Sequence, residues 1–221
     1  MNYLATVLNK TWLTHNVFRL SIERPESFTY QIGQALEISL HKDTEFLKAP
    51  FTITSIYEND KDLQFIIKVY TEHNGITVAL SKLKVNDTIL ITDAWDSFAY
   101  KGKGVFIAAG SGITPFIPIL RLLKEKNKIE DHKLIYANRT EHDIILKQEL
   151  ETILGNSFYN FLSRDHLSKY AFGRVDYELL TNIIDSTHQY FYVCGPKPFL
   201  DSVKSDLLKL GVNKNLIQLI Y

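Results

Sequence analysis

The stretch GVFIAAGSGITPFIPILRLL, residues 104–123, joins an apolar run, a Gly-Ser-Gly turn and a second apolar run with helical spacing. This order is typical of a strand, turn and helix that bind a nucleotide phosphate. Gly110 and Gly112 allow a sharp turn and a close approach to a phosphate, and the following helix points its N–H groups there. Pro115 suits the first helical turn but replaces the third glycine of the dinucleotide fingerprint. A phosphate-binding loop and an ordinary β–α turn are therefore equally good interpretations of these residues alone.

Beyond this turn, short apolar runs alternate with amphipathic segments. We expect strands at residues 105–108, 133–137, 157–162 and 190–194, and helices at 114–126, 143–154, 176–183 and 197–209. Such alternation predicts a parallel sheet covered by helices, which is an α/β domain.

The first hundred residues follow a different pattern. Short segments rich in β-branched and aromatic residues predict strands at 2–10, 16–24, 34–41, 51–58, 63–70 and 87–93. Six such strands with close turns indicate an antiparallel barrel or sandwich. A break at 74–84 predicts a short helix with Asn74 as its N-cap. We therefore expect a two-domain β + α/β protein, with an N-terminal antiparallel β-barrel at 1–100 and a parallel-sheet α/β domain at 101–221.

Composition excludes several classes of protein. Lys plus Arg number 25, as do Asp plus Glu, so the chain lacks the basic excess usual in nucleic-acid binders. Cys194 is the only cysteine, which excludes an internal disulfide, a cysteine-held zinc site and an iron–sulfur cluster. Redox chemistry would have to come from a bound organic cofactor.

The sequence shows no targeting or membrane signal. The first fifteen residues lack a basic region followed by a continuous apolar stretch, so we expect no signal peptide. The most apolar stretch, 104–123, is interrupted by glycines and prolines, which argues against a membrane span. A cytoplasmic location is the expectation.

Five motifs resemble those of the ferredoxin–NADP reductase superfamily, and they occur in its order. They are YQIGQALEISL, APFTITS, IKVYTEHNGITVAL, IAAGSGITP and YVCGPKPFLDSV. The chain is most similar to short bacterial flavodoxin or ferredoxin reductases. The resemblance implies that the barrel binds FAD, that the second domain binds NAD(P), and that hydride passes from nicotinamide to flavin. The implied electron acceptor is a separate protein such as flavodoxin or ferredoxin.

The resemblance implies that two barrel residues lie beside the flavin ring. Phe51 would lie against the isoalloxazine in place of the usual Tyr, and Thr52 would take part in catalysis with a hydroxyl near flavin N5. Without the resemblance, both are ordinary strand residues that alternate in and out of a barrel.

Two further segments match the positions that contact the flavin's phosphates. Gly75, Ile76 and Thr77 stand at the start of the short helix, where backbone N–H groups would meet the pyrophosphate. Lys68 and Tyr70 resemble the basic and aromatic positions that flank the phosphates and the ribityl chain. A lone Lys68 on an alternating strand would otherwise be a solvated charge.

In the second domain the resemblance implies contacts with the nicotinamide nucleotide. Gly110, Ser111 and Gly112 would face its pyrophosphate, and Thr114 would approach the contact between nicotinamide and flavin.

A second motif of this domain would meet the nicotinamide itself. Cys194 at a strand end, followed by Gly195 and Pro196, would lie beside the nicotinamide as a catalytic residue. A lone cysteine of this kind is otherwise most often a small core residue.

The expected nucleotide is NADPH, with NADH possible. Ser163 and Arg164 follow a predicted strand, where NADPH-dependent members of the family carry Ser and Arg for the 2′-phosphate. Arg139 follows the preceding strand, and a guanidinium binds a phosphate bidentately. No acidic residue stands where an NAD-specific site holds the ribose hydroxyls. The alternative interpretation is that these arginines are solvated charges at loop starts.

Two positions leave alternatives open. Tyr221 ends the chain, and the resemblance implies that it covers the flavin and gates catalysis; alternatively the last strand closes the sheet and Tyr221 caps its edge. Ala49 replaces the arginine of the flavin motif, which weakens the expected grip on the pyrophosphate. A loosely held flavin would make the protein a free-flavin reductase, and a catalytically silent nucleotide-binding module is the other alternative.

Overall fold

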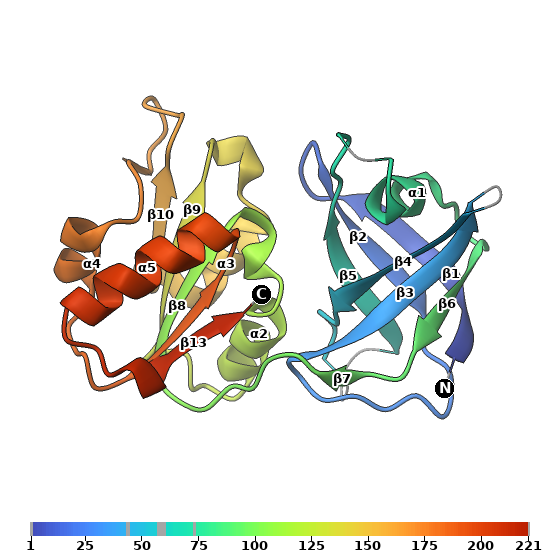
Figure 1. Cartoon of the computed structure of the whole chain (residues 1–221), viewed down its shortest axis with the longest axis horizontal. Coiled ribbons are helices and arrows are strands. Elements are labelled where there is room, and N and C mark those ends of the chain that lie inside the picture. The colour runs from blue at the N-terminus through green and yellow to red at the C-terminus, as the bar shows by residue number, and fades with distance from the viewer. Residues whose placement is uncertain (1, 43–44, 57–60, 73, 221) are drawn as a thin grey trace. The chain divides into compact units, whose positions relative to one another are not determined.

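The structure is a computed structural model that describes residues 2–42, 45–56, 61–72 and 74–220. The chain divides into two compact units, one formed by Met1–Ala99 with Ile117–Ile119 and the other by Tyr100–Phe116 with Leu120–Tyr221. The first is built from strands and one short helix, and the second from alternating strands and helices (Figure 1).

The first unit is an antiparallel sheet. Its strands are β1 (Asn2–Trp12), β2 (Val17–Glu23), β3 (Gln34–Lys42), β4 (Glu45–Thr52), β5 (Asp62–Lys68), β6 (Thr88–Thr92) and β7 (Trp95–Asp96). Six are hydrogen-bonded in the order β4-β3-β6-β1-β2-β5, and β7 pairs with β3. The outer strands approach each other just after β4 ends, where the Thr54 N–H donates to the Gln64 carbonyl over 2.8 Å. The expected antiparallel barrel is confirmed.

Alternating side chains fill the core of this unit. Phe18, Leu20 and Ile22 on β2 are fully buried and share one cluster with Phe65 on β5. Each such side chain contributes about 1.5–3 kcal/mol when it leaves water, so the alternating pattern also sets the strand register.

The fourth strand lies earlier than expected, and the prediction of a strand at 51–58 was wrong. β4 ends at Thr52, and residues 53–56 leave the sheet although all four are buried. The Ser55 hydroxyl accepts hydrogen bonds from the Tyr30 hydroxyl over 2.9 Å and from the Gln64 N–H over 3.1 Å. Ile53 and Thr54 still donate backbone bonds to the Gln34 and Gln64 carbonyls, and the bonds of the Ser55 side chain hold the rest of the segment outside a regular strand. Residues 57 and 58 lie outside the described residues.

The expected short helix is present as α1 (Ile76–Lys82), but Gly75 and not Asn74 is its N-cap. Asn74 stands one residue too early for that position, and the cap makes no side-chain hydrogen bond. The Thr77 hydroxyl instead accepts a bond from the Tyr70 N–H over 3.3 Å. This bond ties the start of α1 to the segment that follows β5.

The second unit is a parallel sheet with helices between its strands, as expected. The strands are β8 (Gly104–Ala109), β9 (Lys133–Asn138), β10 (Phe158–Leu162), β11 (Ala171–Phe172), β12 (Tyr190–Cys194) and β13 (Ile217–Ile220), in the order β11-β10-β9-β8-β12-β13. The α-helices are α2 (Ile117–Glu125), α3 (Lys147–Leu154), α4 (Tyr177–Ile183) and α5 (Lys197–Lys209). Strand β11 was not predicted, because two residues are too few to show an alternating pattern. Strand β13 corresponds to the last strand that the sequence suggests as closing the sheet.

Both faces of this sheet are covered (Figure 1). On one face Ile107 packs in a buried cluster with Leu180 of α4 and Leu200 of α5. On the other face the ring of Phe106 lies with its centroid 5.0 Å from that of Phe116, the N-cap residue of α2. No helix within the described ranges is long and apolar enough to cross a membrane.

Two helices begin later than expected. Gly110–Ile113 forms a short 3₁₀ helix, η1, and α2 starts only at Ile117, so Pro118 rather than Pro115 stands in its first turn. Likewise α3 starts at Lys147 and not at 143, because Leu146 has a left-handed φ of 53° that ends the preceding turn.

Candidate functional site

The carboxyl edge of the second sheet brings together the residues predicted to bind the nicotinamide nucleotide. Gly110, Arg139, Ser163 and Gly195 directly follow β8, β9, β10 and β12 respectively. These four strands are neighbours, in the order β10-β9-β8-β12. Because parallel strands end at the same edge, the four residues form one row, and ligands of open α/β sheets bind at such an edge.

Gly110 and Gly112 in the opening turn have different structural roles. Gly110 has a left-handed φ of 53°, which begins η1. Gly112 lies against the end of β12, where an added Cβ would stand 2.3 Å from the Cys194 carbonyl oxygen and 2.8 Å from the Gly195 nitrogen. Gly112 therefore provides the close packing that the third glycine of the usual fingerprint would supply, and it joins the two motifs of this unit.

The remaining motif residues border the same turn. Ser111 lies within η1 and its carbonyl accepts the Thr114 N–H over 3.1 Å. Thr114 is partly buried directly after η1. Pro196 is the N-cap residue of α5, one residue beyond Gly195.

Cys194 is a partly buried free thiol. Burial raises the pKa of its thiol to about 12, since the charged thiolate would lose its hydration. The group is therefore a neutral thiol at physiological pH, unsuited to act as a nucleophile.

Arg139 and Arg164 lie on neighbouring strand ends. The Arg164 N–H donates to the Arg139 carbonyl over 2.8 Å, and the Ser163 N–H donates to the Asn138 carbonyl over 3.0 Å. Both arginines are exposed, and neither guanidinium makes an ion pair with a described residue. Two exposed arginines whose backbones meet just beyond adjacent strands are suited to bind an anion such as a phosphate.

Two carboxylates hold the loop that follows β10. Glu141 accepts the Ser168 hydroxyl over 2.8 Å and the Lys147 ammonium over 2.7 Å. Glu151 accepts the Tyr170 hydroxyl over 2.5 Å. The loop that begins with Ser163 and Arg164 is thus tied to α3 and to the segment before it.

The residues predicted to contact flavin gather in one region of the first unit, where β4 contacts both β5 and α1. Phe51 and Thr52 end β4, and Phe51 packs against the barrel core. Lys68 ends β5, and its ammonium lies 5.8 Å from the centroid of the Tyr70 ring, whose side chain is 46% exposed. The Tyr70–Thr77 hydrogen bond adds the start of α1 to this group.

Lys48 does not replace the arginine that is missing at Ala49. The Lys48 ammonium pairs with Glu37 at 3.4 Å, and neighbouring strand residues point to opposite faces. Lys68 makes no ion pair with any residue in the described ranges, so it is the cation available to a phosphate in this region.

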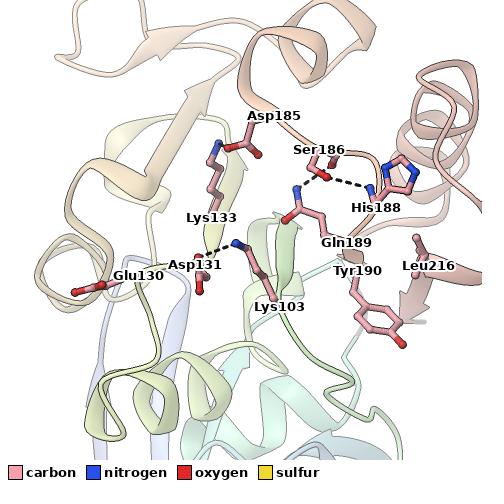
Figure 2. A pocket seen from close by; sticks show the side chains of 10 residues that line it. All are labelled: Lys103, Glu130, Asp131, Lys133, Asp185, Ser186, His188, Gln189, Tyr190 and Leu216. Atoms are coloured by element: carbon pink, nitrogen blue, oxygen red, sulfur yellow. Dashed lines mark hydrogen bonds and ion pairs between the residues drawn. The ribbon is translucent and has the colours of Figure 1, made fainter.

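A cavity of about 660 Å³ lies at the amino edge of the second sheet, away from these motifs (Figure 2). Lys103, Lys133 and Tyr190, at or just before the starts of β8, β9 and β12, contribute to its lining. Both lysines are engaged, Lys103 with Asp131 at 2.7 Å and Lys133 with Asp185 at 3.0 Å. The cavity contains none of the predicted site residues, and a ligand there would have to compete with these ion pairs.

Tyr221, the proposed cover of the flavin, lies outside the described residues. No group of three or more His, Cys, Asp or Glu side chains in the described part of the chain is placed to hold a metal ion. Sequence reasoning missed Tyr136, a buried strand residue whose hydroxyl reaches the opening turn, because nothing in its pattern distinguishes it from a core residue.

An antiparallel barrel followed by a parallel sheet with a glycine turn at its carboxyl edge defines the class of two-domain flavin and nicotinamide oxidoreductases. Residues 3–135 match the model of a family described as FAD-binding domain, and residues 106–205 match one described as oxidoreductase NAD-binding domain. The chain belongs to this FAD-binding family within the ferredoxin–NADP reductase superfamily, and it is a flavin-dependent NAD(P)H oxidoreductase.

Individual relatives agree with this assignment. Human NADH-cytochrome b5 reductase 1 is 27% identical to this chain. The alignment covers 97% of this chain and 84% of the human protein. NADH oxidoreductase HCR of Escherichia coli (strain K12) is 25% identical over 91% of this chain, which spans 62% of that protein.

Two solved structures have the same fold. The CS-b5R domains of human Ncb5or superpose with a TM-score of 0.88 at 23% identity, over 100% of this chain and 70% of that one. A ferredoxin NADP+ reductase from Neisseria gonorrhoeae with bound FAD and NADP superposes with a TM-score of 0.83 at 20% sequence identity. The superposition covers 99% of this chain and 97% of that one.

Proposed function

We propose that the protein takes hydride from NADPH onto FAD and passes the electrons to a separate electron-transfer protein. The observation that carries the nucleotide preference is that Arg139 and Arg164, next to Ser163, are exposed and form no ion pair with any residue that the structure describes. A 2′-phosphate, which NADH lacks, would accept charge-assisted hydrogen bonds from them. Both curated relatives described above, and the further NADH-cytochrome b5 reductases among the matches, carry NADH in their names, so a preference for NADH is the competing outcome.

The residues of the first unit suit FAD. An added Cβ at Gly75 would meet nothing within 4 Å, so the backbone at the start of α1 is open to a ligand. Lys68 offers a cation to the pyrophosphate, and the exposed Tyr70 ring beside it offers a flat apolar surface. Phe51 and Thr52 would then lie beside the flavin ring, with Ile76 and Thr77 at the phosphates.

Bound FAD supplies the ability to accept a hydride and to release electrons singly, while the chain supplies binding and orientation. In the second unit, residues 110–112 would hold the nucleotide's pyrophosphate. Thr114 and Cys194 would lie at its nicotinamide end, where Cys194 contributes a neutral thiol and no charge. The role of Tyr221 as a cover for the flavin stays a prediction.

The acceptor that we propose is a flavodoxin or ferredoxin. A cytochrome b5-type haem protein is the competing acceptor, because it appears in the name of a relative that matches 97% of this chain. Ala49 favours one further candidate, a free-flavin reductase that releases its flavin, since the flavin motif lacks a phosphate-binding charge there.

The test is anaerobic reduction of FAD-loaded protein, followed at the visible flavin band. We expect NADPH to bleach the band faster than NADH, and the reduced protein to pass electrons to flavodoxin or ferredoxin faster than to cytochrome b5. Weak FAD binding combined with rapid reduction of free flavin would favour the free-flavin reductase. No bleaching by either nucleotide would contradict the proposed function and favour a silent nucleotide-binding module.

A further inference from the structure

A buried tyrosine lies directly beneath the opening turn. Tyr136 on β9 is fully buried, and its hydroxyl donates to the Gly110 carbonyl over 2.8 Å. Burial raises the pKa of Tyr136, so the phenol stays protonated and available as a donor. A buried hydroxyl is costly unless it is hydrogen-bonded, so this bond ties the Tyr136 side chain to the Gly110 carbonyl.

The turn needs such a support. Gly110 begins η1 with a left-handed φ of 53°, and η1 extends only to Ile113 before the chain turns again. Short 3₁₀ segments have poorer hydrogen-bond geometry than α-helices. The turn also has no side-chain cap at Ala109. The Tyr136 hydroxyl is therefore a side-chain anchor for a segment with weak internal bonding.

The same strand also holds the second nucleotide loop. The Asn138 carbonyl accepts the Ser163 N–H over 3.0 Å and the Ser163 hydroxyl over 3.4 Å. Asn138 is 8% exposed, so its polar amide is buried at this end of β9. Packing alone would favour an apolar side chain at position 138, so the buried amide indicates that this end of β9 does more than fill the core.

We propose that Tyr136 is a positioning residue for the nicotinamide nucleotide, because its hydroxyl holds the Gly110 carbonyl and so the turn that meets the pyrophosphate. β9 then keeps the pyrophosphate turn and the Ser163 loop in one arrangement before the nucleotide binds. This inference rests on the proposed placement of the nucleotide at the carboxyl edge of the sheet. Tyr136, although buried in the core, would then affect the affinity for the nucleotide.

The protein contains a matched control at the opposite edge of the same sheet. Tyr192 on β12 is also fully buried, and its hydroxyl donates over 2.8 Å to the carbonyl of Gly102, another glycine with positive φ. Tyr136→Phe removes the bond to the Gly110 carbonyl. Tyr192→Phe removes the bond to the Gly102 carbonyl and a second one, in which the Tyr192 hydroxyl accepts the Lys101 N–H over 3.0 Å. Only the first of these bonds supports the proposed nucleotide site.

The experiment measures NADP+ affinity by calorimetry, NADPH steady-state kinetics with ferricyanide, and urea unfolding for both variants. We expect Y136F to raise the Kd for NADP+ and the KM for NADPH about three- to tenfold, with kcat at saturation nearly unchanged. Y192F should lose at least as much stability as Y136F, because the Tyr192 hydroxyl makes two backbone hydrogen bonds, and it should leave both constants at wild-type values. Equal constants in the two variants would overturn the inference.

Two further outcomes are decisive. If Y136F does not fold, 3-fluorotyrosine placed singly at 136 or at 192 retains the hydroxyl. The fluorine resonance at 136 should then shift on NADP+ addition while that at 192 stays fixed, and equal responses would overturn the inference. If wild-type protein binds neither nucleotide, the proposed function fails and this inference fails with it; nucleotide binding that is insensitive to Y136F removes only the inference.

Discussion

A Cβ atom on Gly112 would stand 2.3 Å from the carbonyl oxygen of Cys194, closer than any real Cβ contact. The glycine turn after β8 and the Cys-Gly-Pro segment after β12 are far apart in the sequence, yet they are packed together at backbone distance. The geometry of one motif therefore depends on the other.

We predict that Gly112→Ala destabilises the protein by about 1–3 kcal/mol, because the backbone of β12 must move to admit the methyl group. Urea unfolding of the second unit measures this loss. Gly75→Ala is the control, since an added Cβ there meets nothing within 4 Å and φ is −88°. Equal stability of the G112A variant and the wild type would contradict the observed packing.

Nucleotide choice should respond to the two exposed arginines at the carboxyl edge of the second sheet, Arg139 and Arg164. Arg139→Ala and Arg164→Ala are each expected to lower kcat/KM for NADPH about tenfold, through loss of a charge-assisted bond to the 2′-phosphate, and to leave NADH kinetics nearly unchanged. Arg174→Ala, at another exposed arginine of the same unit, is the control. A parallel loss with both nucleotides would show that the arginines do not bind the 2′-phosphate.

Cys194 should resist alkylation in the folded protein. With a pKa of about 12 in place of the ordinary 9.0, its thiolate fraction at pH 8 falls about a thousandfold, and only the thiolate reacts. Iodoacetamide labelling followed by mass spectrometry, in native buffer and in guanidinium, compares the two states. Similar labelling rates in both would mean that the thiol is not shielded as the structure shows.

Stability should fall in mild acid because of His132. The side chain is 3% exposed and shares a 2.7 Å hydrogen bond with the Tyr100 hydroxyl, and burial lowers its pKa below the ordinary 6.5. Below pH 6.5 the unfolded chain therefore binds a proton that the folded state resists. Stability is fully present above that pH and declines as pH falls toward 5, by at most about 1.4 kcal/mol per pH unit.

The measurement for this prediction is urea unfolding between pH 7.5 and pH 5. His132→Gln removes the titrating ring and should flatten the pH dependence, while His188→Gln, at an exposed position, should not. Asp131 and Lys103 also act on His132, in opposite directions, so their ion pair is left intact in both variants. An unchanged slope in H132Q would assign the acid sensitivity to other groups.

Much of the architecture was predictable from the sequence because it depends on local patterns. Alternating apolar residues on strands such as β2, and the strand–helix alternation after residue 104, require buried faces, which a barrel or sandwich and a covered parallel sheet supply. Motif order also predicted which residues gather at the carboxyl edge of the second sheet, because parallel strands all end there. These features need no knowledge of distant contacts.

Tertiary structure alone decided the details that depend on a partner elsewhere in the chain. Residues 53–56 lie outside the strand, where the Ser55 hydroxyl bonds to Tyr30 and Gln64, and those bonds cannot be predicted from the segment itself. Gly112 is required because the Cys194 carbonyl lies against it. The hydrogen bond of the Tyr136 hydroxyl depends on where the turn places the Gly110 carbonyl. Pattern and propensity determine which faces are buried, whereas close approach and hydrogen-bond partners are properties of two segments at once. For that reason the sequence determined the two folds and the edge that carries the site, and only the tertiary structure decided how that edge is held in place.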